Sequence, residues 1–142
     1  MIRTAQPHDL SALSELLTAL VGYPPKSEVS LLGIMQEYTV GNNRILVYED
    51  EGQVLGFVSL ATLPMLHIAG HLARITAFCV SEEARGQGIG QQLLQAVVDY
   101  SQSIGCKRME VTSGDRPERV AAHRFYENNG FKYDSKRFSR WL

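Results

Sequence analysis

Several features that mark other protein classes are scarce or missing in this 142-residue sequence. Its two cysteines, Cys79 and Cys106, form no CxxC pair, so a disulfide scaffold and a cysteine-based zinc knuckle are excluded. Lysine and arginine together number 14 against 15 aspartates and glutamates, so the basic excess typical of nucleic-acid-binding proteins is absent. We therefore expect no nucleic-acid partner.

Long apolar runs are also missing. No stretch approaches the roughly 20 apolar residues of a membrane helix, and the N-terminus MIRTAQPHDL lacks the apolar segment of a signal peptide. The sequence is 44% hydrophobic and 20% charged, an ordinary balance for a globular protein. We expect one domain over residues 1–142, in the reducing cytoplasm, with no membrane partner.

Apolar and β-branched residues predict five extended segments, at 2–5, 44–48, 54–63, 72–80 and 108–112. The second and third form a hairpin through a turn at 49–53, and Pro64 is expected to interrupt the chain after it. A sixth extended segment, named here the C-terminal tail, is expected over residues 131–142.

Apolar residues at helical spacing predict four helices, at about 8–20, 28–38, 89–104 and 118–128. Pro7 suits the first turn of the first helix, Ser27 can cap the start of the second, and Gly130 can close the last. Some strands are joined by hairpins and others by helices, which predicts an α/β domain with a mixed sheet.

The segment with the clearest chemistry is VSEEARGQGIG at 80–90, where a strand runs through a turn into a helix. We name its residues 85–90 the glycine loop. Gly86, Gly88 and Gly90 let backbone N–H groups approach a ligand closely, and the start of a helix adds unpaired N–H groups and a positive dipole end. Arg85 adds a charged donor. The sequence therefore predicts a phosphate or pyrophosphate site.

Two other phosphate-binding loops are excluded. A Walker A loop needs Lys and Ser or Thr after its last glycine, but Gly90 is followed by Gln91 and Gln92. A dinucleotide fingerprint (G-x-G-x-x-G) needs a third glycine three positions after its second glycine. Here Gln91 is three positions after Gly88, and Leu93 is three positions after Gly90, so no such glycine is present. A purely structural turn is the remaining alternative, and three glycines beside an arginine favour the ligand site.

The glycine loop resembles the Arg/Gln-x-x-Gly-x-Gly/Ala loop of the GCN5-related N-acetyltransferases, and AHRFYENNGF at 122–131 is similar to that family's Ala-x-x-x-Tyr-x-x-x-Gly-Phe signature. The hairpin and the N-terminal helix pair also fit, so the resemblance covers nearly the whole chain. It implies an α/β (α+β) domain with a mixed, mostly antiparallel sheet flanked by about four helices. It also implies acetyl-CoA as the acetyl donor.

In such proteins the loop holds the CoA pyrophosphate, and the pantetheine arm lies beside the central strand. The resemblance thus implies cofactor contacts for Phe78, Cys79, Val80, Arg85, Gly86, Gln87, Gly88, Ile89, Gly90 and Arg119. A backbone N–H of that strand would stabilise the tetrahedral oxyanion. Arg119 stands where many members have asparagine, so it retains donors but not the amide geometry.

Tyr126 is the residue that we expect to act in catalysis, because a phenol can donate a proton to the departing CoA thiolate. A core aromatic is the alternative, since Ala122, Phe125 and Tyr126 share one helix side. Family members with a carboxylate base in the central strand place it around Thr76 or Ala77, and neither residue can act as a base. No general base is therefore assigned.

The expected function is direct transfer of an acetyl group to the primary amine of a small molecule. An acyl-CoA-binding sensor or regulatory module without turnover is the alternative. The end of the chain, with AHRFY and KRFSRWL, also resembles the metal-dependent aminoalkylphosphonate N-acetyltransferases, but Ala77 lacks their carboxylate and no metal is assigned. Phe138 and Trp141 in an exposed edge segment suggest a homodimer.

Two further side-chain types can be weighed. Cys79 could be a nucleophile, but a buried cysteine more commonly packs as a small hydrophobe. His67 and His71 are four residues apart, a spacing that would place both side chains on one face of a helix, but the sequence predicts no helix there. They are therefore weak candidates for a pair of metal ligands. His123 could orient substrate or simply pack.

Overall fold

A computed structural model describes residues 1–24 and 27–142 of the chain. Within these residues lies a five-stranded sheet of order β1-β2-β3-β4-β5. Its strands are β1 (Ile2–Thr4), β2 (Arg44–Asp50), β3 (Gln53–Met65), β4 (Gly70–Val80) and β5 (Arg108–Val111). β1 to β4 pair antiparallel and β5 pairs parallel to β4. The predicted mixed, mostly antiparallel sheet is confirmed.

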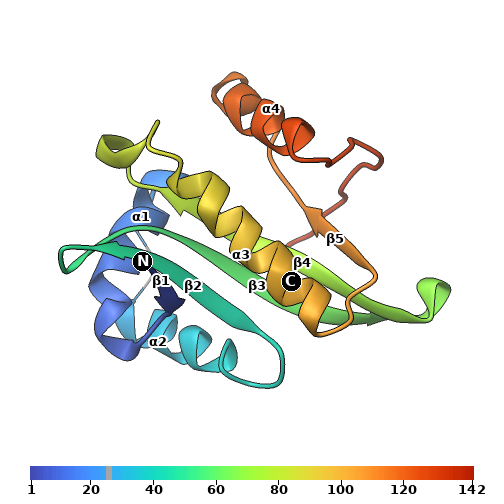
Figure 1. Cartoon of the computed structure of the whole chain (residues 1–142), viewed down its shortest axis with the longest axis horizontal. Helices are drawn as coiled ribbons and strands as arrows, with labels where there is room; N and C mark the ends of the chain where they lie inside the picture. Colours follow the sequence, from blue (N-terminus) through green and yellow to red (C-terminus); the bar gives the residue numbers. More distant parts are fainter. Residues whose placement is uncertain (25–26) are drawn as a thin grey trace.

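The described residues form four α-helices that flank this sheet, as predicted: α1 (Leu10–Val21), α2 (Glu28–Glu37), α3 (Ile89–Ser103) and α4 (Val120–Asn128). Short 3₁₀ turns are η1 (Pro7–Asp9), η2 (Leu66–Ile68), η3 (Glu82–Ala84) and η4 (Pro117–Arg119). Figure 1 shows α3 running along one face of the sheet, while α1 and α2 pack on the other. None of the helices in the described residues has both the length and the apolar character to cross a lipid bilayer.

The predicted helix ends are confirmed where local chemistry fixes them. Ser27 caps α2, since its hydroxyl accepts the N–H of Ser30 at 3.0 Å. Gly130 closes α4 in the left-handed region at φ +89°. Around it the N–H of Phe131 donates to Tyr126 O and the N–H of Gly130 to Glu127 O, the paired bonds of a Schellman motif.

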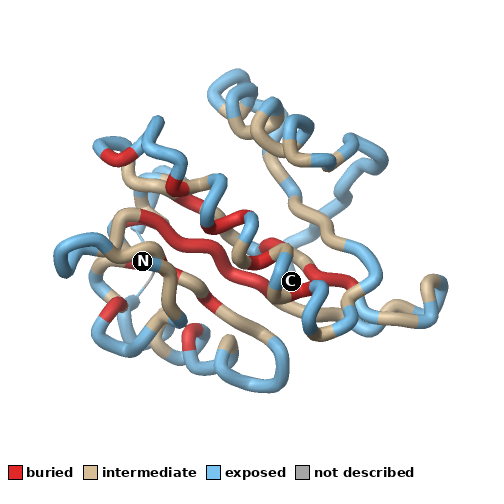
Figure 2. Tube along the Cα trace, viewed as in Figure 1, coloured by how far each residue is buried: buried red, intermediate tan, exposed pale blue. Residues whose placement is uncertain are grey.

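The core has two layers, one on each face of the sheet. Between α3 and the sheet, Leu93 and Val97 pack with Val58 and Ile75. On the opposite face α1 and α2 cover β2 and the start of β3, where the apolar side chains are Leu13, Leu16, Met35, Val47 and Phe57. Each fully buried side chain of this kind contributes about 1.5–3 kcal/mol. Figure 2 shows this burial concentrated along β3 and the inner side of α3.

The C-terminal part of the chain is packed more loosely. No residue of α4 is fully buried. The C-terminal tail forms no strand in the structure, so its prediction as an extended edge segment is wrong. Its polar anchors to β5 and the following loop are Arg108 to Asp134 at 2.7 Å and Arg137 to Thr112 at 3.1 Å. Two side-chain contacts do not replace a backbone ladder, and the tail stays exposed (Figure 2).

The prediction that Pro64 interrupts the chain is also wrong, because Pro64 lies within β3 opposite His71 of β4. β2 pairs with β3 only as far as Leu60. Beyond Leu60, the described part of β3 has β4 as its sole strand partner, so the missing N–H of a proline can face the unpaired side.

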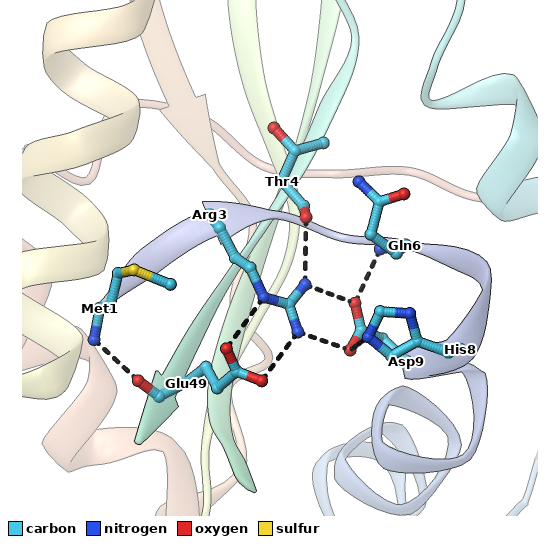
Figure 3. A network of polar contacts seen from close by, with 7 residues as sticks. All are labelled: Met1, Arg3, Thr4, Gln6, His8, Asp9 and Glu49. Carbon is cyan, nitrogen blue, oxygen red and sulfur yellow. Dashed lines mark hydrogen bonds and ion pairs between the residues drawn. The ribbon is translucent and has the colours of Figure 1, made fainter. Parts of the chain in front are cut away.

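An ion-pair network fixes the start of the chain to β2 (Figure 3). The Arg3 guanidinium donates to both carboxylate oxygens of Asp9, at 2.8 and 2.9 Å, and to Glu49 at 3.2 Å. Asp9 also accepts the N–H of Gln6 at 2.7 Å. Asp9 is only 3% exposed, and its hydrogen bonds from Arg3 hold the pKa of its carboxyl below the usual value.

Candidate functional site

The glycine loop has the backbone that its sequence predicts. Gly86 and Gly88 adopt φ values of +81° and +79°, a region that residues with a Cβ rarely occupy. Gly88 is the N-cap of α3, and the N–H of Gln92 donates to Gly88 O at 3.1 Å as the first bond of the helix. The N–H groups of Ile89, Gly90 and Gln91 therefore precede the hydrogen-bonding pattern of α3 and face outward. This is the geometry of an anion site.

The three glycines have different surroundings. A Cβ added at Gly86 or Gly88 would meet no atom within 4 Å, so both positions border open space. A Cβ at Gly90 would instead lie 3.7 Å from Val80 and 3.8 Å from Phe125. The Cα of Gly90 thus faces the protein, where an added methyl group would be in ordinary van der Waals contact with Val80 and Phe125.

Beside the glycine loop, β4 and β5 part. β5 pairs with β4 from Leu72↔Arg108 to Ile75↔Val111 and, within the described chain, no further. At this point β4 also carries a bulge, since Ile75 pairs with Leu60 and Ala77 with Ser59, leaving Thr76 without an opposite residue. We name residues 76–80 the open half of β4. It contains the predicted cofactor residues Phe78, Cys79 and Val80.

Tyr126 reaches the open half of β4 from α4. Its ring lies edge-on to Phe78 with centroids 6.5 Å apart, and within 5.6 Å of both Phe125 and Phe131. Burial raises the pKa of the Tyr126 phenol, while the positive charge of Arg119 opposes this rise. The phenol is therefore fully protonated at neutral pH and available as a proton donor.

The two predicted arginines approach the same region from different elements. Arg85, in the glycine loop, donates through Nε to Val80 O at 3.4 Å. Arg119 is the N-cap of α4 and donates through Nε to Ser113 at 3.3 Å. The charges of both act on the pKa of Cys79. Positive charge thus converges on the carboxyl end of β4.

Cys79 is buried and turned away from this site. Its sulfur lies 3.5 Å from Leu16 O of α1, in the core layer on the opposite face from Tyr126. Burial raises the pKa of the thiol, so the nucleophilic thiolate is disfavoured. Only the backbone of Cys79 is placed to contact a ligand at the open half of β4.

The histidines do not assemble a metal site. The imidazole of His123 contacts Gly114 O at 2.9 Å, which ties α4 to the loop before it. His71 lies in β4 opposite Pro64, and His67 lies in the turn η2. In the part of the chain that the structure describes, no three His, Cys, Asp or Glu side chains gather closely enough to hold a metal ion.

Two residues that sequence reasoning did not single out also reach the open half of β4. The phenol of Tyr38 and the hydroxyl of Ser59 each lie 2.7 Å from the hydroxyl of Thr76. They are 38 and 17 residues away from it in sequence, so no local pattern could have connected them.

Comparison with known proteins assigns the family. A family model described as "Acetyltransferase (GNAT) family" matches residues 12–131, most of the chain. The chain belongs to the GNAT acetyltransferase family. The resemblance inferred from the glycine loop and the α4 signature is thereby confirmed.

Two curated GNAT relatives are named as N-acetyltransferases. A glucosamine 6-phosphate N-acetyltransferase from Trypanosoma brucei brucei is 28% identical over 134 residues, covering 92% of this chain and 88% of that protein. An aminoalkylphosphonate N-acetyltransferase from Salmonella typhimurium is 34% identical over 91 residues, covering 64% of this chain and 58% of that protein. The enzyme class of this GNAT chain is therefore N-acetyltransferase.

A solved structure extends the likeness to the whole fold. A protein from Bacillus halodurans C-125, described as a transcriptional regulator, aligns with a TM-score of 0.89 at 25% identity, covering 100% of this chain and 99% of that one. An acetyltransferase from Trypanosoma brucei also aligns, with a TM-score of 0.81 at 26% identity, covering 100% of this chain and 99% of that one. The acetyltransferase fold expected from the sequence is therefore confirmed.

Proposed function

We propose that this GNAT protein transfers the acetyl group of acetyl-CoA directly to the primary amine of a small molecule within a ternary complex. One observation carries the proposal. A glycine loop with outward amides, a stretch of β4 that no longer pairs with β5 and a protonated tyrosine lie side by side at the carboxyl end of β4. These are the parts that a CoA thioester requires, namely a pyrophosphate cradle, a backbone edge for the pantetheine arm and a proton donor for the thiolate.

The cradle combines neutral and charged donors. The amides of Ile89 and Gly90 supply oriented N–H groups at the positive end of the α3 dipole. Arg85 adds a guanidinium beside them. Together with Gly86, Gln87 and Gly88 they would bind the pyrophosphate, and the pantetheine arm would extend along Phe78 to Val80.

In the reaction, the amine lone pair attacks the thioester carbonyl carbon, and the C–S bond then breaks with its electron pair going to sulfur. Backbone N–H groups on the open half of β4 would stabilise the oxyanion, each contributing about 3–4 kcal/mol. Tyr126 would protonate the thiolate, and the nearby charge of Arg119 would favour the anions that form.

For the acceptor we propose a small amine that carries a phosphate or phosphonate group. Both curated relatives are named for such amines. The identity of either relative is too low to transfer one substrate, and the two names share only the amine and the phosphorus oxyanion.

Ligand-induced thermal stabilisation tests the donor first. Acetyl-CoA and CoA should each raise the melting temperature of the chain, whereas ATP alone should not. Thiol release should then be followed with glucosamine 6-phosphate, 2-aminoethylphosphonate and spermidine as acceptors. Stabilisation by ATP without stabilisation by CoA would overturn the proposal.

One observation favours a second candidate, a sensor that binds acyl-CoA without turnover. The Bacillus halodurans protein that aligns over the whole chain is described as a transcriptional regulator. Binding of acetyl-CoA with no thiol release across the amine panel would support this candidate over the first.

We also propose that two copies associate through the C-terminal tail. Phe138 and Trp141 are 92% and 97% exposed. A groove of about 880 Å³ lies between β5, α4 and the start of the tail. Light scattering at micromolar concentration should give the mass of a dimer, and replacing Phe138 and Trp141 with serine should give a monomer. A monomeric parent protein would contradict this assembly.

The reducing cytoplasm is the compartment that we propose for this protein. Cys79 and Cys106 are both free, which suits such an environment.

A further inference from the structure

A small hydroxyl cluster lies where β4 bulges, at the first residue of its open half. Thr76 Oγ1 is 2.7 Å from Tyr38 Oη and 2.7 Å from Ser59 Oγ. Tyr38 is the C-cap of α2, Ser59 is a buried residue of β3, and Thr76 is exposed. Three elements therefore converge on the Thr76 hydroxyl, which is the member of the cluster most open to a ligand.

One arrangement of the hydroxyl protons is consistent with every hydrogen bond of the cluster. Ser59 Oγ lies 3.5 Å from Ala77 O, and a carbonyl oxygen can only accept. If Ser59 donates there, Thr76 donates to Ser59, either to its hydroxyl or to its carbonyl at 3.3 Å. Tyr38 then donates to Thr76. The Thr76 oxygen has two lone pairs, so one stays available for an incoming donor.

An acceptor amine needs such a partner at this place. The thioester would lie along the open half of β4, which begins at Thr76 itself. A primary amine that attacks it must present its lone pair to the carbonyl carbon, so its N–H groups have to be held by acceptors on the other side. Bulges are common next to active sites, where they re-aim a side chain, and Thr76 is the extra residue of this bulge.

Resting on the proposed acetyl transfer, we propose that Thr76 orients the acceptor amine by accepting one of its N–H groups, with Tyr38 and Ser59 fixing the hydroxyl. The amine nitrogen forms the C–N bond with its lone pair, and the thioester sulfur leaves with the electrons of the C–S bond. The surplus proton on nitrogen passes to solvent water. Thr76 takes no proton, so the cluster works without a carboxylate at this position.

Four variants test this role. Thr76→Val removes the hydroxyl and keeps the branched shape, whereas Thr76→Ser keeps the hydroxyl. Tyr38→Phe removes only the phenol oxygen. Thr62→Val makes the same chemical change in β3, opposite Ala73, and is the matched control. Each variant is first shown to be folded by its melting curve.

Two measurements are compared for every variant. Acetyl-CoA affinity is measured by calorimetric titration, and kcat/KM for the amine is measured with glucosamine 6-phosphate and 2-aminoethylphosphonate. Thr76→Val should lower kcat/KM about 10- to 100-fold, the cost of a misplaced reactant. Thr76→Ser should stay within about threefold of the parent, and Tyr38→Phe should fall between them. Acetyl-CoA affinity should not change in any of the four.

The outcomes separate this proposal from the one on which it rests. A parent chain that does not bind acetyl-CoA or acetylates no amine overturns both. A parent that acetylates an amine, with Thr76→Val equally active, overturns only the role of Thr76. Equal loss in Thr76→Ser and Thr76→Val would also overturn it, because the hydroxyl would then not be the group that matters. If Thr76→Val does not fold, Tyr38→Phe decides, and unchanged activity there overturns the cluster.

Discussion

The two halves of β4 differ although they belong to one continuous strand. Residues 72–75 pair with β3 on one side and β5 on the other. Within them Ala73 and Ile75 are buried in the α3 core layer, and Arg74 forms an ion pair with Glu110 of β5. The open half pairs with β3 alone, and Thr76 is exposed at its bulge. The first half holds the sheet together, and the second leaves backbone free for a ligand.

The candidate site exists because β4 and β5 part after Ile75↔Val111. The β4–β5 ladder ends at Ile75↔Val111, one residue before the bulge at Thr76, and the glycine loop later turns the chain into α3. Changes in the open half should therefore affect chemistry or ligand binding, and changes in the paired half should affect stability.

The largest expected effect is that of Tyr126→Phe, which leaves the aromatic packing against Phe78 and removes one hydroxyl. If the phenol protonates the thiolate, kcat should fall by about 10²–10⁴. The acetyl-CoA Kd should stay the same, because the pyrophosphate cradle is separate. Single-turnover acetyl transfer with a folded variant is the measurement. An unchanged rate would return Tyr126 to a packing role.

A second prediction concerns Gly88→Val, which places a branched side chain in front of the outward amides of α3. Losing two charge-assisted hydrogen bonds, each of about 1.5–3 kcal/mol, should weaken acetyl-CoA binding at least about 100-fold. Calorimetric titration of the folded variant is the measurement. Gly105→Val is the matched control, since Gly105 has a similar φ of +82° beyond the other end of α3.

Both glycine variants should lose similar stability, because each forces a branched residue into the left-handed region. Only Gly88→Val should lose acetyl-CoA. Equal affinity in the two variants would contradict the cradle. Gly90→Ala should keep its affinity, since a methyl group there meets Val80 and Phe125 at ordinary contact distances.

A third prediction concerns Asp9→Asn, far from both halves of β4. The pKa of Asp9 is lowered in the folded protein, so its ionised form stabilises the fold above the unfolded pKa of about 4, and this contribution is lost as pH falls. The variant should be less stable at neutral pH by about 2 kcal/mol. Denaturant unfolding from about pH 7 to about pH 2.5 should show the gap to the parent narrowing.

Asp50→Asn at the exposed end of β2 is the control for that titration. It removes a carboxylate outside the Arg3 network and should leave stability nearly unchanged. A gap between Asp9→Asn and the parent that stays constant over the pH range would show that charge pairing with Arg3 is not its source.

The smallest expected effect is that of Ile75→Val in the paired half of β4. Ile75 is 2% exposed, and losing one buried methylene should lower the free energy of unfolding by about 0.5–1.5 kcal/mol. Acetyl-CoA affinity should not change. Chemical denaturation and calorimetry on one preparation measure both quantities. A weakened affinity without lost stability would break the division between the two halves.

Much of the fold could be predicted because local chemistry determines it. Helix ends are set by the backbone freedom of Gly88 and Gly130 and by the capping hydroxyl of Ser27. All three residues lie at a helix end in the structure. The prediction for Pro64 is wrong because a proline is tolerated where β3 extends beyond its pairing with β2, and the length of that pairing is a property of the sheet and not of the segment.

The tail and the hydroxyl cluster were beyond sequence reasoning for a related reason. Phe138 and Trp141 fit a strand pattern, but a strand needs a partner edge, and the tail forms no ladder in the structure. Tyr38, Ser59 and Thr76 meet only because α2, β3 and β4 are packed together. The glycine loop, by contrast, was selected from a local pattern, and Tyr126 was selected from the family resemblance of residues 122–131. Their roles stay predictions.

Hydrogen–deuterium exchange of backbone amides with and without acetyl-CoA tests the central claim most directly. The ligand should slow exchange in residues 76–80 and in the glycine loop, because their N–H groups gain acceptors or lose contact with water. Residues 72–75, already paired on both sides, should not change. Protection spread equally over both halves of β4, or absent from the open half and the glycine loop, would contradict the account.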